Sequence, residues 1–151
     1  MKRIALGTAQ FGMNYGIANR TGKVRDHEIA SILDTAASSG CDTLDTAPVY
    51  GDSEKILGNY GVSGWHVISK IPSLPPDLRD VRGYVTKSVE ESLKNLKIPS
   101  LHTLMVHNSK DVTGDAAEKL FHAMGSLKNE KLIENMGVSV YDPVSLNMLC
   151  A

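Results

Sequence analysis

Four side chains able to take part in proton transfer occur at regular points along the sequence. Asp45, Lys70 and His107 each end or directly follow a short apolar run, and Tyr50 lies in a loop shortly after Asp45. Runs of this length and composition predict buried strands. Because the carboxyl ends of parallel strands meet at one edge of a sheet, we expect the acid, the phenol, the ammonium and the imidazole to lie close together.

These residue types suit the protonation of an oxygen atom while hydride reaches the carbon beside it. A charge placed after apolar residues is costly unless it is paired, so Asp45 and Lys70 are expected to form an ion pair. A nearby ammonium should lower the pKa of Tyr50 from about 10, and His107 could orient the same oxygen or shuttle the proton. The alternative is that Asp45 only caps a turn and Tyr50 only packs.

Strands and helices are predicted to alternate along the chain. Apolar runs predict strands at residues 4–8, 43–45, 65–70, 101–106 and 133–140. Helical spacing and terminal signals predict a helix capped by Asp26, one over 53–58, one over 81–96 capped by Asp80, one across 117–127 and one beginning at Asp142-Pro143. Residues 9–23 hold too many turn formers for regular structure and predict a long loop, whose Phe11 and Tyr15 could line an apolar substrate pocket.

Strands that alternate with helices, with no hairpin signal between neighbours, predict an α/β fold with a parallel sheet. Two architectures fit this pattern: an open doubly wound sheet, and the leading part of an eight-stranded (β/α) barrel of the TIM type. The turn after the first strand, residues 6–12, lacks the Gly-x-Gly-x-x-Gly spacing of dinucleotide-binding open sheets. This difference mildly favours the barrel.

Composition limits the class of protein. A chain of 151 residues, 42% hydrophobic, fits one domain over residues 1–151. A net charge of −1 with interspersed signs argues against a nucleic-acid partner, and no apolar run approaches the roughly 20 residues that cross a membrane. With no signal-peptide core after Met1, we expect a cytoplasmic protein. Cys41 and Cys150 lack metal-type spacing, so we expect two buried thiols and no metal.

The motif Asp45-Thr-Ala-x-x-Tyr50-Gly-x-Ser-Glu54, with Lys70 and His107 at the next two strand ends, resembles the aldo-keto reductases. The similarity extends over essentially the whole chain and includes Leu6-Gly7-Thr8 and Gly137-Val-Ser139. It implies about five of the eight units of a (β/α)8 barrel that uses NADPH to reduce a small aldehyde or ketone.

The resemblance also implies roles for single residues. Tyr50 would be the general acid, Lys70 and Asp45 its supporting pair, and His107 the residue that orients the substrate carbonyl. Ser139 would help to hold the nicotinamide carboxamide, Thr8 and Ala9 would lie beside the nicotinamide ring, and Asp45 would also approach the cofactor.

Two departures from the family pattern affect these expectations. Val140 stands where much of the family has asparagine, and the chain ends before the segments that bind the adenine and the pyrophosphate in the family. We therefore expect an incomplete NADPH site, and a catalytically silent binding or regulatory module, or a truncated remnant, is the alternative function. Open sheet edges and an uncovered apolar face predict self-association or a partner that covers the open barrel.

Overall fold

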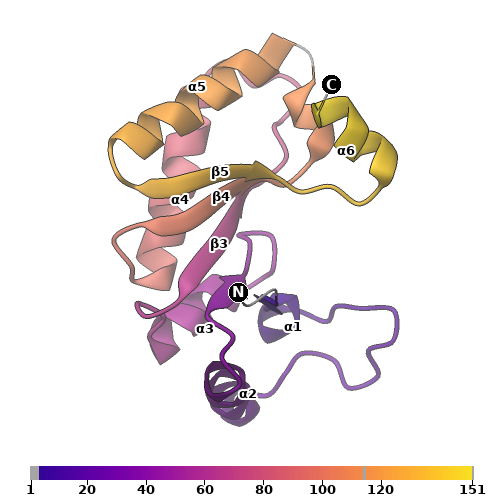
Figure 1. The fold of residues 1–151 in the computed structure, drawn as a ribbon, viewed down its shortest axis with the longest axis vertical. Helices are drawn as coiled ribbons and strands as arrows, with labels where there is room; N and C mark the ends of the chain where they lie inside the picture. The colour runs from indigo at the N-terminus through magenta and orange to yellow at the C-terminus, as the bar shows by residue number, and fades with distance from the viewer. Residues whose placement is uncertain (1–3, 114, 151) are drawn as a thin grey trace.

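The computed structural model describes residues 4–113 and 115–150, in which strands and helices alternate as predicted (Figure 1). The strands are β1 (Leu6–Gly7), β2 (Thr43–Asp45), β3 (His66–Ile71), β4 (Leu101–Val106) and β5 (Ile133–Val138). The helices are α1 (Ala9–Gly12), α2 (Asp26–Ser38), α3 (Ser53–Tyr60), α4 (Val81–Leu96), α5 (Asp115–Asn129) and α6 (Pro143–Cys150), with a 3-10 turn, η1 (Ser109–Val112).

The five strands form one parallel sheet whose spatial order is β1-β2-β3-β4-β5. Gly7 pairs with Asp45, Asp45 pairs with Ile68, and Lys70 pairs with Met105. A doubly wound sheet would reverse its strand order at a switch point, whereas a barrel keeps the order of the sequence. The fold is therefore the barrel type, with five of the eight β/α units.

The helices bury apolar stripes against the sheet. In Figure 1, α3, α4 and α5 form a layer along one face of the sheet. Helix α4 shows why: Val81, Val85, Val89 and Leu96 recur at helical spacing and are buried. Asp80 caps this helix as predicted, because its carboxylate accepts a hydrogen bond from the Gly83 amide at 2.8 Å.

Four local predictions are wrong. Residues 9–12 form the short helix α1 rather than irregular loop, and Phe11 on it lies in the core at 3% exposure instead of lining a pocket. Arg25, not Asp26, is the N-cap of α2, where the Glu28 carboxylate accepts a hydrogen bond from the Arg25 amide. Strand β5 ends at Val138 because its partner β4 ends at Val106.

The thiol prediction is wrong for Cys41, which is only half-buried, while the Cys150 side chain lies outside the part that the structure describes.

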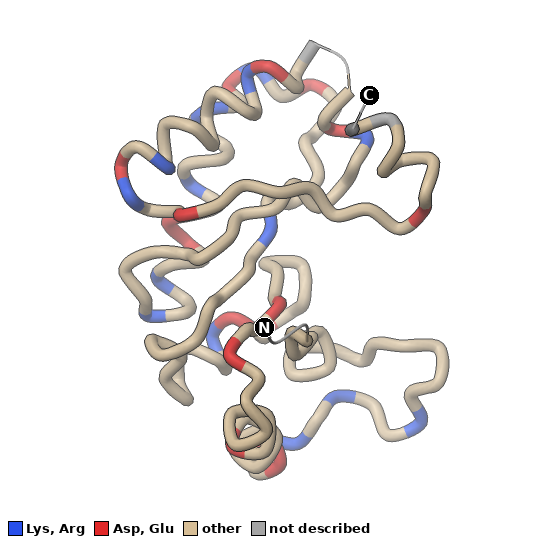
Figure 2. Tube along the Cα trace, viewed as in Figure 1, with Lys and Arg blue, Asp and Glu red and all other residues tan. Residues whose placement is uncertain are grey.

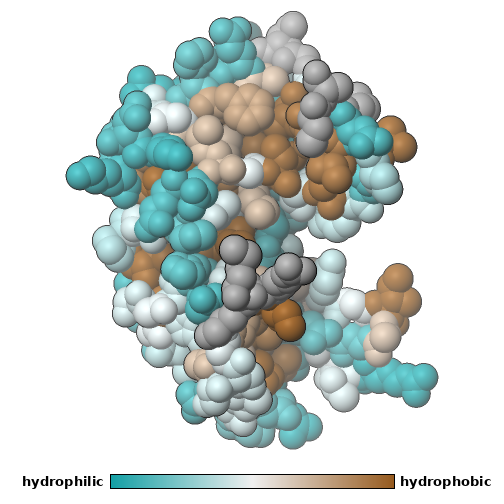
Figure 3. All heavy atoms as spheres, in the orientation of Figure 1, coloured by the Kyte–Doolittle hydropathy of each residue, from teal (hydrophilic) through white to brown (hydrophobic). Residues whose placement is uncertain are grey.

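Figure 2 shows basic and acidic residues interspersed along the helices and loops. Hydrophobic surface gathers around α6 and β5 in Figure 3, where Met136, Tyr141 and Val144 are exposed. Among residues 4–113 and 115–150, none of the helices combines the length and hydrophobicity that crossing a membrane requires.

Candidate functional site

The predicted ion pair between Asp45 and Lys70 is present at the carboxyl ends of β2 and β3. The Lys70 ammonium donates to Oδ1 of Asp45 at 2.7 Å and to the carbonyl oxygen of Thr46 at 2.9 Å. Lys70 is 4% exposed, so its charge is almost fully removed from water. The carboxylate and the carbonyl compensate for that loss and hold the ammonium at one point of the sheet edge.

Tyr50 lies beside this ammonium in the loop between β2 and α3. The Lys70 nitrogen is 4.9 Å from the centre of the Tyr50 ring. The loop is held against α1, since a side chain at Gly12 would overlap the Tyr50 carbonyl oxygen, and Gly51 next to it has a φ of 61° that favours glycine. Close backbone packing therefore fixes the position of the phenol.

His107 follows β4 and completes the predicted group. Its ring lies edge-on to that of Tyr50, with centroids 5.9 Å apart and an interplanar angle of 88°. Its backbone amide donates to the carbonyl oxygen of Ile71 at 3.2 Å, which ties the loop after β4 to the end of β3. The structure thus brings all four residues predicted from the sequence together at one edge of the sheet.

The expected direction of the Tyr50 pKa is wrong. Burial of the phenol raises its pKa above the ordinary value, and the charges of Asp45 and Tyr141 act in the same direction. The Lys70 ammonium opposes this through its charge and by hydrogen bonding, but burial has the larger effect. At neutral pH the phenol therefore keeps its proton, which is the form that can donate.

The pKa of His107 is lowered from its ordinary value. Burial of the imidazole is the main cause, the charge of Lys70 acts in the same direction, and Asp45 opposes both. The ring is therefore neutral near pH 7, so it carries one N–H donor and one acceptor nitrogen.

A buried hydroxyl network beneath the site escaped the sequence analysis. Ser53 donates to the carbonyl oxygen of Thr8 at 2.9 Å, Thr46 contacts the Ser53 hydroxyl at 3.2 Å, and Thr8 donates to the carbonyl oxygen of Asp45 at 2.9 Å. Thr8, Thr46 and Ser53 are all fully buried. The network joins the ends of β1 and β2 to the start of α3, and its only sequence signal is three hydroxyl residues beside strand ends.

The residues predicted to hold the nicotinamide fit it in part. Ser139 is half-buried and its hydroxyl has no hydrogen bond to a described residue, so it can meet a carboxamide. Ala9 is buried at the start of α1, and the hydroxyl of Thr8 is already engaged with Asp45. Asp45 is only half-buried and still faces solvent. Thr8 and Ala9 can therefore shape the wall of a cofactor site but offer no free side-chain donor to it.

An aromatic side chain from the loop after α1 joins the same site. The ring of Tyr15 lies 6.3 Å from that of Tyr50, and its backbone carbonyl accepts hydrogen bonds from Gln10 at 2.8 Å and Asn19 at 2.9 Å. Asn19 also accepts from the amides of Thr21 and Gly22. This internal bonding gives the loop a defined shape that places Tyr15 against the phenol.

Comparison with known proteins agrees with this geometry. The model of the aldo/keto reductase family matches residues 3–150. A crystal structure from Pseudomonas aeruginosa, of a protein assigned to the aldo-keto reductases, is 31% identical with a TM-score of 0.74, covering 89% of this chain and 54% of that one. The aldo-keto reductase str7 of Strobilurus tenacellus is 25% identical over 142 residues, which make up 89% of this chain and 40% of str7.

An aldo-keto reductase from Klebsiella pneumoniae, solved in complex with NADPH, shares the fold with a TM-score of 0.70 at 23% identity, covering 97% of this chain and 48% of that one. The chain thus spans about half the length of these solved structures. Since the family model covers nearly all of its 151 residues and the strand order is that of the barrel, this chain belongs to the aldo/keto reductase family.

Proposed function

We propose that this chain carries the proton-donating site of an NADPH-dependent carbonyl reductase, with Tyr50 as the general acid. One observation carries the proposal: the Lys70 ammonium is buried, held by Asp45 at 2.7 Å, and lies 4.9 Å from the Tyr50 ring. A fixed cation beside a phenol stabilises the phenolate that forms when the proton leaves. A lysine that served only to neutralise Asp45 would not require a phenol above it.

NADPH, when bound, would supply hydride to the carbonyl carbon. Tyr50 donates its proton to the carbonyl oxygen as that oxygen gains negative charge, which gives the alcohol. The phenolate left on Tyr50 is stabilised by Lys70 until a proton from solvent restores the phenol. Because the pKa of the phenol is raised from an ordinary value of about 10, the donor form is present at neutral pH when each turnover begins.

His107 positions the substrate in this proposal. A neutral imidazole can donate its N–H to the carbonyl oxygen without adding a second positive charge beside Lys70. Its edge-on contact with Tyr50 at 5.9 Å between centroids places it on the same side as the phenol. The two donors would then converge on one oxygen, which fixes the carbonyl for hydride attack on its carbon.

The cofactor and substrate follow from the same arrangement. The Ser139 hydroxyl would hold the nicotinamide carboxamide, while Thr8 and Ala9 would border the ring, as a barrel places cofactors at the carboxyl ends of its strands. The substrate would be a small aldehyde or ketone, and Tyr15, whose ring lies 6.3 Å from that of Tyr50, would lie beside it. With about half of a relative's length present, we expect NADPH to bind weakly.

Reduction of 4-nitrobenzaldehyde by NADPH tests the proposal. Tyr50→Phe removes only the acidic hydroxyl and should lower the rate by about 100-fold or more, since general acids contribute on that scale. Tyr60→Phe is the matched control, because the Tyr60 hydroxyl donates to the backbone of Asp26 away from the site. Equal rates for the wild type and Tyr50→Phe, in folded proteins, would refute the role of Tyr50.

A further inference from the structure

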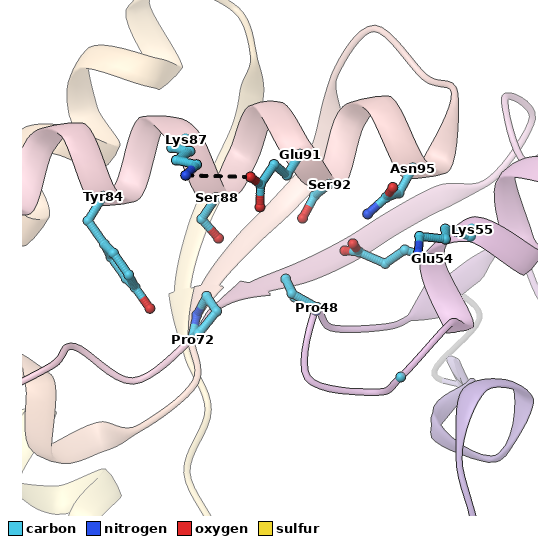
Figure 4. A pocket seen from close by; sticks show the side chains of 11 residues that line it. Pro48, Glu54, Lys55, Pro72, Tyr84, Lys87, Ser88, Glu91, Ser92 and Asn95 are labelled. Atoms are coloured by element: carbon cyan, nitrogen blue, oxygen red, sulfur yellow. Dashed lines mark ion pairs between the residues drawn. The ribbon is translucent and has the colours of Figure 1, made fainter.

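A cavity lies on the α3–α4 side of the loop that carries Tyr50. It occupies about 400 Å³ between α3 and α4, and its walls include Pro48 and Gly51 from that loop. Figure 4 shows α4 running along one side of the cavity, with the side chain of Glu54 reaching in from α3 on the other. The Asp45, Lys70 and His107 side chains take no part in its walls.

Close packing at one point of the two helices leaves room for the cavity beside it. A side chain at Gly58 would overlap the backbone carbonyl of Asn95, so α3 and α4 touch there. Glu54 lies one turn before Gly58, where the facing residues of α4 are the small Ser88 and Ser92. The small side chains on α4 leave the space open, and Pro48 of the Tyr50 loop forms part of its wall.

Glu54 places a carboxyl group in this cavity without a cationic partner. The residue is 3% exposed, and its Oε1 accepts a hydrogen bond from the Ser69 hydroxyl at 2.7 Å. Within the described part of the chain, Oε2 has no hydrogen bond and Glu54 has no ion pair. Ser92, 2% exposed and also in the wall, has a hydroxyl with no partner among the described residues.

The cations nearest to Glu54 in the cavity wall are engaged elsewhere. Lys55 pairs with Asp52 at 3.5 Å and Lys87 pairs with Glu91 at 4.0 Å, and both lysine side chains are largely exposed. Among the described residues, no fully buried side-chain nitrogen or oxygen lacks a hydrogen-bond partner, so the free oxygen of Glu54 is open to the cavity. A carboxylate in that position is stabilised when it meets a cation in a small polar cavity. The cavity therefore has the charge and the hydrogen-bond acceptors for a positive ligand.

We infer that this cavity binds a small organic cation through a primary ammonium group. Two acceptors in its wall, Oε2 of Glu54 and the Ser92 hydroxyl, have no hydrogen bond to a described residue, and a primary ammonium supplies N–H donors to both. Pro72 and the Tyr84 ring form an apolar part of the wall that suits a short hydrocarbon chain. A metal ion fits less well, because no group of three acidic, histidine or cysteine residues converges within the described chain.

Isothermal titration calorimetry of the 151-residue chain with n-butylammonium chloride tests this inference. We expect saturable binding of one equivalent, and no saturable binding of 1-butanol, which has the same chain without the charge. Glu54→Gln keeps the shape but removes the charge, and should weaken binding by about tenfold or more, as for other hydrogen-bonded charges. Glu90→Gln is the matched control, since Glu90 is an exposed carboxylate on α4 outside the cavity wall, and should change binding less than about twofold.

Ser88→Leu gives a second, independent test, because it fills the cavity and leaves Glu54 in place. It should abolish n-butylammonium binding while circular dichroism stays unchanged, and it decides the matter if Glu54→Gln does not fold. Failure of the wild type to bind, equal binding by 1-butanol, or full binding by Ser88→Leu would overturn the inference. Displacement of n-butylammonium by an equal concentration of potassium would also overturn it, in favour of an inorganic cation site.

Discussion

Removal of the Lys70 charge should raise the pKa of Tyr50 further. The ammonium and burial act on the phenol in opposite directions, so the Lys70→Met substitution leaves burial unopposed. At 4.9 Å from the ring centre, one positive charge stabilises a phenolate by roughly 1 to 3 kcal/mol, for an effective dielectric constant between those of water and of a protein surface. That free energy corresponds to an upward shift of about one to two pKa units.

The ultraviolet absorbance of tyrosinate measures this shift without any cofactor or substrate. The Tyr50 titration is isolated as the difference between each protein and the same protein carrying Tyr50→Phe. Asp45→Asn is combined with Lys70→Met, because a lone carboxylate would otherwise replace the ion pair and would itself raise the phenol pKa. Removal of both charges should still shift the Tyr50 titration upward, by less than Lys70→Met alone.

Lys55→Met is the control for this titration. Lys55 is paired with Asp52 on the surface at the start of α3, so its removal should leave the Tyr50 titration unchanged. An unchanged Tyr50 pKa in Lys70→Met would refute the reasoning, because it would mean that the ammonium does not act on the phenol. An equal shift of the Tyr50 pKa in Lys55→Met would also refute it, because the shift would then come from the change in net charge and not from the nearby ammonium.

Three further predictions concern the fold and its surface. Gly58→Ala should lower the free energy of unfolding in urea by roughly 1 to 3 kcal/mol, because the new methyl group meets the Asn95 carbonyl. Gly125→Ala, on α5 with open space around it, is the control and should leave that free energy unchanged or raise it slightly. Equal losses in the two variants would contradict this. Because the folded-state pKa of His107 lies below the ordinary value of about 6.5, protonation of His107 favours the unfolded chain. The free energy of unfolding should therefore fall as pH drops below about 6.5, and His107→Asn should flatten that dependence. Parallel curves of unfolding free energy against pH for the two proteins would contradict this. Size-exclusion chromatography with light scattering should show self-association driven by the exposed apolar residues of β5 and α6, and a monomer that binds no hydrophobic dye would contradict it.

The sequence was sufficient for the order of the elements and for the four side chains that the structure brings together at one edge of the sheet. Apolar runs and helical stripes place Asp45, Lys70 and His107 at strand ends, and strands β2 and β4 have the predicted bounds. These features depend on local patterns, which a single sequence contains. The choice between an open sheet and a barrel needed the resemblance, because both folds share the same strand-helix pattern.

Features that depend on contacts distant in sequence could not be predicted. Helix α1 has poor local signals and exists because Phe11 is buried and Gly12 lies against the Tyr50 loop. The sign of the Tyr50 pKa shift depends on how deeply the loop buries the phenol, which residue types alone do not state. The Glu54–Ser69 contact joins α3 to β3 across 15 positions, and no spacing rule connects the two residues.

A double-mutant cycle on Tyr50 and Lys70 tests the central claim most directly. The measured quantity is the single-turnover rate of NADPH oxidation by 4-nitrobenzaldehyde in the wild type, each single variant (Tyr50→Phe and Lys70→Met) and the double variant. If Lys70 acts through the phenol, the double variant should be no slower than Tyr50→Phe alone. Losses that multiply, or a wild-type rate no higher than that of Tyr50→Phe, would contradict the account.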